Sequence, residues 1–438
     1  MGSGFTDTYG LGLRAMSMGG AFTAVADDYS AAYYNPAGLS QIDGDHFDFS
    51  YIYTAPKIDV TKDGGGALKT YDSHANVRTD PTKAESGNGL NMGIPLIGLV
   101  LDINRIIKLK PNLQLGLAIS MPESMDVSYR IHDYPPDQPH FIRYGDDIDR
   151  ITIIAGLGLE AIKDLLHVGA GVQAMLYGNG KFYIDNPQVI STSQEVVSQA
   201  EFNAKFQFEP TAGILFTPLD KQLKIGFSWK DRQELKLDPI PAITSIDIGY
   251  MKAGVPMIID ICAYFNPMEF SLGASYDIRK IPLMVSLQVD KQRWSQYRYS
   301  TTDSYHYLDG GPNFKDTYNW RLGLEYKLNK DWTFTGGYNR QPSPVPDQSG
   351  RVSNYIDMNK NIFSLGANYN LKDPFNIMKQ PMKLSAFVQY QALQSLHVNK
   401  DGVTGITWLN EDGKSNTEPS YSVKGSAIAG GLSFSAAW

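Results

Sequence analysis

The sequence predicts an all-β fold, a 14-stranded antiparallel transmembrane β-barrel plugged by a small N-terminal hatch. Three observations lead to this prediction. Apolar and polar residues alternate with period two along most of the chain, the connections between these stretches are long and short in turn, and the first 44 residues do not alternate. We therefore divide the chain into a hatch, residues 1–44, and a barrel, residues 45–438.

The composition agrees with a membrane barrel. Charged residues make up 19% of the 438 residues, whereas a soluble domain carries about 25%. Tyr (26) outnumbers Phe (19) and Trp (6), which suits aromatic girdles at two membrane interfaces. The formal net charge of −7 argues against nucleic acid as a partner. The single cysteine, Cys262, excludes an intrachain disulfide, and no apolar run reaches the about 18 residues of a membrane-spanning helix.

The hatch comes first in the chain and is rich in Gly, Ala and Met. No signal peptide precedes it, so we interpret the sequence as a mature chain whose signal is replaced by a start codon or short tag. The hatch is too short to own a core, so we expect several of its apolar residues to line a ligand-binding site, with flexible Met side chains adapting to the ligand. These candidates are Phe5, Leu11, Leu13, Met16, Met18 and Phe22.

Near the end of its sequence the hatch contains a turn of defined geometry. Pro36 fixes its own φ and biases Asn35 away from the helical region, while the Asn35 side chain can bond locally. In most proteins such a turn would simply lie at the surface. The motif consists of Asn35, Pro36, Ala37 and Gly38, followed by Leu39.

The strands follow from about Asp45 onward. In the clearest one, residues 318–328, the apolar side chains from Tyr318 to Leu328 fall on one face and polar ones such as Arg321 on the other. Each stretch is long enough for the about 9–11 residues of a tilted spanning strand. The predicted strands are His46–Val60, Leu90–Ile103, Asn112–Ile131, Ile148–Glu160, His167–Tyr177, Ala200–Thr217, Gln222–Lys236, Met257–Ile278, Pro282–Ser300, Asp316–Leu328, Trp332–Arg340, Lys360–Leu371, Met382–Val398 and Lys424–Trp438.

The connections alternate in length, as in an up-and-down outer-membrane barrel with short periplasmic turns and long extracellular loops. A soluble Greek-key sandwich has no reason to alternate in this way. We therefore expect the long loops Thr61–Gly89 and Asn399–Val423 to face outside. The last strand ends in Trp438, on one face with Leu432 and Phe434. It resembles the signal read by the barrel-assembly machinery, although Phe is the usual last residue; the alternative is an ordinary outward apolar face.

Several motifs, in order, resemble one known family. In the hatch they are Gly10-Leu11-Gly12-Leu13-Arg14-Ala15, Ala26-Asp27-Asp28 and Asn35-Pro36-Ala37-Gly38-Leu39. Downstream they are Arg293-Trp294-Ser295-Gln296-Tyr297, Phe314-Lys315-Asp316-Thr317-Tyr318, Asp331-Trp332-Thr333-Phe334 and Ser343-Pro344-Val345-Pro346. Each is weak alone, but the ordered set covers nearly the whole chain. It resembles the FadL/TodX (OMPP1) family of outer-membrane transporters for long-chain fatty acids and aromatic hydrocarbons.

The resemblance implies a route for the ligand. Captured outside, the ligand would move to a buried apolar site near the hatch and leave sideways through a gap made by an inward kink in the third strand. The candidate kink is Pro122, Glu123 and Ser124, because proline cannot donate a ladder hydrogen bond. The alternative is an extracellular extension where pairing has ended.

The resemblance also implies a basic residue near the end of the fifth strand that meets a fatty-acid carboxylate. The nearest match is Lys181, whose alternative is a solvated loop lysine. A second basic residue expected before the tenth strand is missing. Gly310 and Gly311 stand there, with His306 the closest substitute, which puts a strict preference for carboxylates in doubt.

We therefore expect a passive outer-membrane transporter, a monomer in membrane lipid, for a fatty acid, alkane or aromatic hydrocarbon. We expect no enzyme activity, no cofactor and no metal, because the seven His residues lack ligand spacing and the acidic run at Asp146–Asp149 lacks the rest of a calcium loop. The lumen charges form a structural network or line a polar path; they are Asp290, Arg321, Glu325 and Lys327. The alternatives are a polar-solute porin and a barrel-based enzyme with a catalytic constellation at one rim.

Overall fold

The structure is a computed structural model of the chain. It describes residues 4–63, 86–87, 91–107, 112–121, 140–144, 151–185, 197–236, 240–247, 252–259, 262–297, 313–351, 355–371, 381–400 and 420–438.

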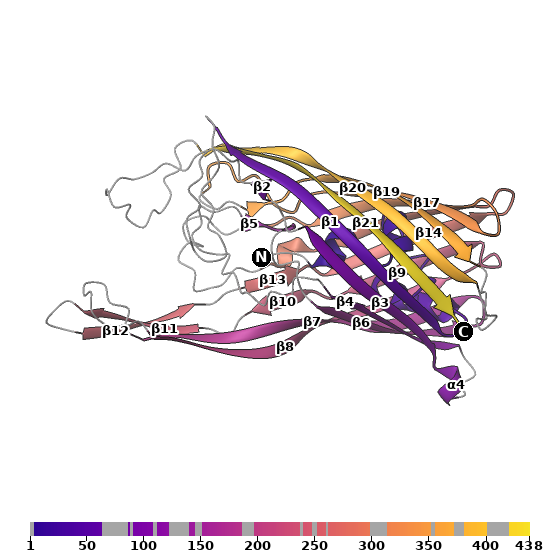
Figure 1. Ribbon diagram of the computed structural model, residues 1–438, viewed down its shortest axis with the longest axis horizontal. Coiled ribbons are helices and arrows are strands. Elements are labelled where there is room, and N and C mark those ends of the chain that lie inside the picture. Colours follow the sequence, from indigo (N-terminus) through magenta and orange to yellow (C-terminus); the bar gives the residue numbers. More distant parts are fainter. Residues whose placement is uncertain are drawn as a thin grey trace.

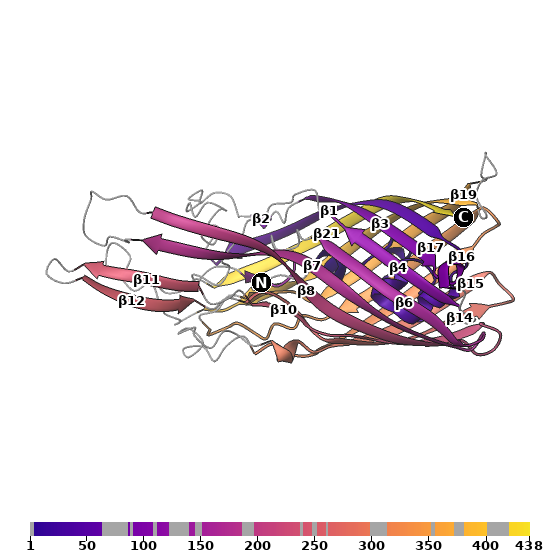
Figure 2. The ribbon, with the colours of Figure 1, turned by 90° about the horizontal axis from the view of Figure 1, so that it is seen from below.

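A closed antiparallel barrel dominates the fold (Figures 1 and 2). The main sheet has 15 strands, of which the two-residue β2 (Ser86–Gly87) pairs only with β1, leaving 15 − 1 = 14 for the barrel wall. Because β1 pairs with both β3 and β21, the sheet closes. The wall strands are β1 His46–Lys62, β3 Met92–Asp102, β4 Leu113–Ser120, β6 Thr152–Ile162, β7 Leu166–Asp185, β8 Val197–Phe216, β9 Leu223–Lys230, β14 Glu269–Ile278, β15 Leu283–Gln292, β16 Thr317–Lys327, β17 Trp332–Gln341, β19 Lys360–Leu371, β20 Met382–Val398 and β21 Tyr421–Ala437.

The predicted fold class is confirmed, and so are the predicted faces of the clearest strand. In β16, Trp320 is 61% exposed on the outer surface, while Asn319 is fully buried in the lumen. Lipid outside and a packed lumen inside require this alternation of apolar and polar positions. Arg321 and Glu325 also point inward, whereas Lys327 is exposed at the end of the strand.

Short turns join the strands at the end of the barrel where Trp438 lies, and long connections join them at the other end (Figure 1). Described parts of the long connections form small sheets of their own. β10 (Gln233–Lys236) pairs with β13 (Cys262–Asn266), and β11 (Ile240–Asp247) pairs with β12 (Lys252–Ile259). The β11–β12 hairpin and the ends of β7 and β8 project beyond the wall together (Figure 2).

Several predicted strand boundaries differ from the structure. The stretch Met257–Ile278 divides among β12, β13 and β14, and the stretch Pro282–Ser300 ends as a strand at Gln292. The stretch Gln222–Lys236 divides, because β9 leaves the wall after Lys230, where its partner β8 carries Pro210. A proline has no N–H to extend a ladder. The third wall strand, predicted to reach Ile131, is β4 and ends at Ser120.

The hatch lies inside the barrel as a chain of short helices (Figure 1). Its helices are α1 Phe5–Tyr9, α2 Leu13–Ser17, α3 Ala31–Tyr34 and the 3-10 helix η1 Pro36–Gln41. The short helices α4 (Asn104–Ile107) and η3 (Trp294–Gln296) lie in connections. Among the described residues, no helix combines the length and the apolar character needed to cross a membrane.

Candidate functional site

Most of the hatch is seated closely against the wall. We call residues 17–42 the docked segment. Inward-facing glycines on the surrounding strands leave room for it, since a Cβ added at any of them would come within 3 Å of hatch atoms. At Gly158, for example, it would lie 2.6 Å from the carbonyl oxygen of Pro36. These glycines are Gly98, Gly116, Gly158, Gly169, Gly213, Gly226, Gly337 and Gly366.

The Asn35 motif is the most closely held part of the docked segment. Asn35 is fully buried, and its Nδ2 donates to the carbonyl oxygens of Thr23 (2.8 Å) and Ile214 (3.1 Å). Its Oδ1 accepts from the amide of Ala37 (3.2 Å) and thereby caps η1. Asn35 thus ties the hatch to itself and to β8, as a turn on the surface would not.

Arg14 links α2 to the docked segment and to the wall. Its Nε donates to Glu325 Oε2 of β16 at 2.6 Å, and its Nη1 pairs with Asp27. Burial raises the pKa of Asp27, but the charge of Arg14 outweighs burial and lowers that pKa to about 2. On the wall, Asp290 pairs with Arg321 at 2.5 Å, so these lumen charges belong to a network that touches the hatch.

An apolar region fills the lumen between the hatch and the wall strands β1, β3, β20 and β21. We call it the lumen cluster. Its hatch members are Phe5, Tyr9, Leu13 and Met16, and its wall members include Ile52, Ile58, Val60, Met92, Ile94, Phe387, Leu393, Val398, Tyr421, Val423, Ala427 and Ala429. Tyr144, Ile356 and Met358 close it on the side of the long connections. A barrel interior is ordinarily polar, so a continuous apolar patch in this lumen calls for a reason other than folding in lipid.

The six apolar hatch residues singled out in the sequence divide into two groups. Phe5, Leu13 and Met16 belong to the lumen cluster, whereas Leu11, Met18 and Phe22 belong to a separate core that the hatch shares with the wall. All six are at most 4% exposed. Periodicity could not separate the groups, because the hatch helices have only four to six residues each.

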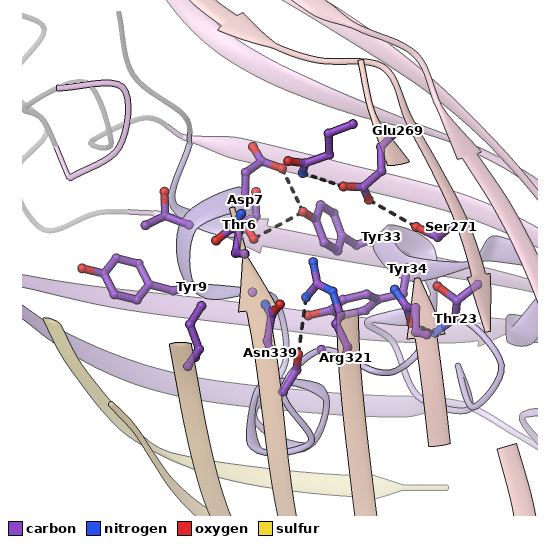
Figure 3. A pocket seen from close by; sticks show the side chains of 18 of the residues that line it. Thr6, Asp7, Tyr9, Thr23, Tyr33, Tyr34, Glu269, Ser271, Arg321 and Asn339 are labelled. Atoms are coloured by element: carbon purple, nitrogen blue, oxygen red, sulfur yellow. Dashed lines mark hydrogen bonds between the residues drawn. The ribbon is translucent and has the colours of Figure 1, made fainter. Parts of the chain in front are cut away.

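A small polar cavity lies beside α1 (Figure 3). Its volume is about 30 Å³, which admits water but not a ligand that needs a pocket of about 300 Å³ or more. Asp7, Tyr33 and Tyr34 of the hatch face Glu269 and Arg321 of the wall across it (Figure 3).

Asp7 is partly buried at this cavity. Tyr33 Oη donates to Asp7 Oδ1 at 2.8 Å, and Lys230 Nζ lies 3.1 Å from Glu269 Oε1 and 3.7 Å from the centre of the Tyr33 ring. Burial raises the pKa of Asp7, and the charge of Lys230 offsets this only in part. Sequence reasoning missed Asp7, Lys230 and Glu269. The available signal was that Asp7 is one of the few charged residues in the hatch.

Other predicted site residues fall where less is described. Lys181 lies in β7 opposite Glu201 of β8, on the part of the hairpin beyond the last β6 pair, Thr152 with Met175. Pro122, Glu123 and Ser124 lie outside the described residues, as do His306, Gly310 and Gly311. The described part of β4 ends immediately before the candidate kink, and the amide of Met121 still donates to Pro95 (3.1 Å). Within the described ranges, no group of three or more His, Cys, Asp or Glu side chains could hold a metal ion.

Comparison with known proteins gives a family match over nearly the whole chain. The family model described as outer membrane protein transport protein (OMPP1/FadL/TodX) matches residues 6–435. The long-chain fatty acid transport protein of Salmonella typhi is 23% identical over 430 residues, which cover 89% of this chain and 87% of that protein.

Two further similarities are more limited. Alkane uptake protein A of Marinobacter nauticus is 26% identical over 147 residues, so this chain spans only 32% of that protein's length. The crystal structure of a FadL homologue from Pseudomonas aeruginosa has a TM-score of 0.57 at 17% identity, with 98% of each chain covered. At that identity the structural likeness supports the fold alone.

Proposed function

The chain belongs to the OMPP1/FadL/TodX family, so it is an outer-membrane transporter of hydrophobic compounds rather than an enzyme, and we propose that its ligands are long-chain fatty acids or hydrocarbons. Transport is passive. Each CH₂ moved from water into hydrocarbon gains about 0.8 kcal/mol, so a long acyl chain gains several kcal/mol without an energy source.

The lumen cluster is the observation that carries the proposal. It joins apolar residues of the hatch to apolar wall residues that point inward, such as Ile52, Ile94 and Phe387. In our proposal the ligand chain lies here, against Phe5, Leu13 and Met16. The polar cavity beside α1 is too small for this role.

Replacing each hatch methionine with Asp tests the location of the binding site. Met16→Asp places a carboxylate in the lumen cluster and should abolish fatty-acid binding in a barrel that still folds. Met18→Asp places it in the hatch core and should unseat the hatch instead, as seen by protease sensitivity of the N-terminus. Normal binding in Met16→Asp would remove the lumen cluster from the site.

We further propose that the ligand leaves sideways through the wall, from an apolar pocket directly into lipid tails. Support comes from the pairing of β4, which reaches its last described partners, Leu96 and Thr152, at Ser120. Pro122 follows two residues later. Deleting Pro122–Ser124, or substituting residues that restore regular pairing, should lower uptake while binding stays near normal. Uptake at the wild-type rate would favour passage down the lumen.

Liposome uptake separates the function classes. Protein in liposomes should pass a long-chain fatty acid or an alkane and exclude a sugar of similar mass. Sugar uptake at a comparable rate would favour a polar-solute porin.

The remaining expectations concern topology and partners. We propose that the protein is a monomer, that the barrel-assembly machinery reads the last strand, and that the long connections face outside. Protease added to intact cells should cut within Thr61–Gly89 and Asn399–Val423 and spare Asp220 and Asn329. Cleavage confined to the short turns would reverse the topology.

A further inference from the structure

Two basic side chains point outward from the barrel wall, where the long connections begin. In β15 and β17 the side chains alternate between the lumen and the outer face, and the buried Asp290 and Asn339 mark the lumen side. Their next neighbours, Lys291 and Arg340, therefore lie half-buried on the outer face. We call Lys291 and Arg340 the outer cations. Only β16 separates their strands, whose backbones are therefore roughly 10 Å apart.

The outer cations lie at the level of an aromatic girdle. Across the sheet, Lys291 is paired with Tyr318 of β16 and Arg340 with Trp320, and both rings are exposed on the outer surface. Tyr326, near the short turn at the other end of β16, is exposed in the same way. Outer-membrane barrels carry such girdles at both edges of their apolar band, at the depth of the lipid headgroups. The outer cations therefore meet headgroups rather than acyl chains.

Neither outer cation forms an ion pair with any residue that the structure describes. Lys291 Nζ lies 5.7 Å from the centre of the Tyr318 ring. Arg340 Nη1 donates two long bonds, each of 3.4 Å, to the carbonyl oxygen of Lys360 and to Asn361 Oδ1. Within the described ranges, the Nε and Nη2 groups of Arg340 have no acceptor. Two positive charges and several N–H donors thus face the headgroup layer together.

Other outward-facing basic residues differ in this respect. On β1 and β21, Asp59 is the register partner of Lys424 and lies two residues from Lys57 on the same outer face. These two lysines therefore have a carboxylate beside them. Basic side chains of this kind reach the headgroup layer without selecting a lipid. The outer cations lack such a carboxylate among the described residues, so their counter-charge has to come from outside the chain.

The charge and the surroundings indicate which molecule brings it. An arginine side chain binds two phosphate oxygens with its planar fork, and a lysine adds a point charge. A phosphate monoester carries a charge of about −1.5 to −2 at pH 7, which balances two cations. Toward the short turns, the outer face of the same strands is apolar, with Leu287 and Leu324 exposed. A lipid can therefore place its phosphate between the outer cations and its acyl chains against these leucines.

We propose that Lys291 and Arg340 bind the phosphomonoester headgroup of a membrane lipid in the leaflet that faces the long connections. Phosphate oxygens accept from Lys291 Nζ and from Arg340 Nε and Nη2. The bound headgroup bridges β15 and β17 across β16 and fixes the depth of this side of the barrel. The site lies outside the barrel and apart from the lumen cluster, so it is independent of the transported ligand.

Lipid titrations of the full chain in nonionic detergent test the proposal, with bound lipid counted by native mass spectrometry. The probes are bisphosphoryl lipid A, its dephosphorylated form and phosphatidylglycerol, a phosphodiester. Bisphosphoryl lipid A should bind at least tenfold more tightly than the other two, and more weakly as salt is added. The double variant Lys291→Met with Arg340→Gln should lose this preference, and Arg340→Lys, which keeps the charge without the fork, should lose part of it. Lys57→Met is the matched control and should bind as the wild type does.

Three results would overturn the proposal. Equal binding of the three lipids would show a general attraction of lipid to the wall, and an equal loss in Lys57→Met would show a general effect of positive charge. Displacement of lipid A by inorganic phosphate at equal concentration would assign the outer cations to a free anion. The comparison of lipids on the wild-type protein holds even if a variant does not fold. Fatty-acid uptake by liposomes should be equal in the double variant and the wild type, so the proposed function is tested separately.

Discussion

The docked segment and helix α1 belong to the same hatch but are held in different ways. The docked segment meets the wall backbone at glycines, and wall side chains such as Gln288 and Ser286 bond to its backbone at 2.8–2.9 Å. Helix α1 receives longer bonds, 3.2 Å from Gln391 to Thr8 and 3.4 Å from Gln389 to Tyr9, and adjoins a polar cavity at the partly buried Asp7. Close packing thus holds the docked segment in place, whereas the position of α1 depends on the charges around Asp7.

The difference teaches where a ligand can act on the hatch. Moving the docked segment would break close packing around much of the barrel and leave the buried Asn35 side chain without its partners. Moving α1 would instead expose the partly buried Asp7 carboxyl fully to water and open one edge of the lumen cluster. We therefore expect ligand-linked motion in residues 5–10 and little motion in residues 17–42.

The largest expected effect comes from filling a glycine under the docked segment. In Gly337→Ala the new Cβ would collide with the backbone of Gly19, and overpacking of this kind costs about 3 kcal/mol. Hydrogen exchange of the docked segment should accelerate accordingly. Gly336→Ala is the matched control on the same strand, because its Cβ would meet nothing closer than Leu365 Cδ2 at 3.7 Å. Equal protection in the two variants would contradict the close-approach account.

Asn35→Ala should come second. It leaves the carbonyl oxygen of Thr23 and the amide of Ala37 without these partners and removes one bond to Ile214, and a buried unsatisfied group costs about 1–3 kcal/mol. We expect proteolytic cleavage of the hatch in variant barrels that still migrate as folded on gels. A protected hatch in this variant would show that the glycine contacts suffice.

A smaller effect should appear in the pH dependence of exchange protection, which should differ between α1 and the docked segment. Because burial raises the pKa of Asp7, docking favours its protonated form; this stabilisation is complete below the ordinary pKa of Asp and is lost as pH rises through the raised value. Exchange protection of residues 5–9 should fall over that window, and Asp7→Asn should remove the dependence.

Asp27 in the docked segment should give the opposite dependence of stability on pH. Its pKa is lowered to about 2, so its contribution is present above the ordinary pKa of Asp and is lost as pH falls toward 2. A similar pH profile for the two segments would refute the distinction between them.

The smallest effect should lie outside the hatch, in the short turn after β6. Asp164 pairs with Lys221 at 2.6 Å, and both side chains are more than half exposed. Exposed pairs are screened by water and contribute little. Asp164→Asn should leave Tm and the hatch protection unchanged, which makes it a baseline for the variants above.

Much of the wall could be predicted from the sequence, whereas little of the site could. The faces of β16 follow from alternation, because Trp320 meets lipid and Asn319 the lumen. The apolar hatch residues are buried, while their expected place in a ligand-binding site stays a prediction. However, their division between the lumen cluster and the hatch core depends on how each short helix is rotated about its axis. Helices of four to six residues are too short for a repeating apolar pattern to predict that rotation.

The sequence by itself determined the barrel. Apolar and polar residues alternate with period two along each strand, because lipid imposes this pattern on each strand separately. The alternating connection lengths and the non-alternating N-terminus can likewise be recognised along the chain. Only the tertiary structure decided which glycines face the hatch and that Asp7 and Lys230 line one cavity. It also decided that Arg143 pairs with Asp357, although the two are 214 residues apart in the chain. Closing the barrel brings such distant residues together, and the charge and shape they share exist only once the sheet has closed.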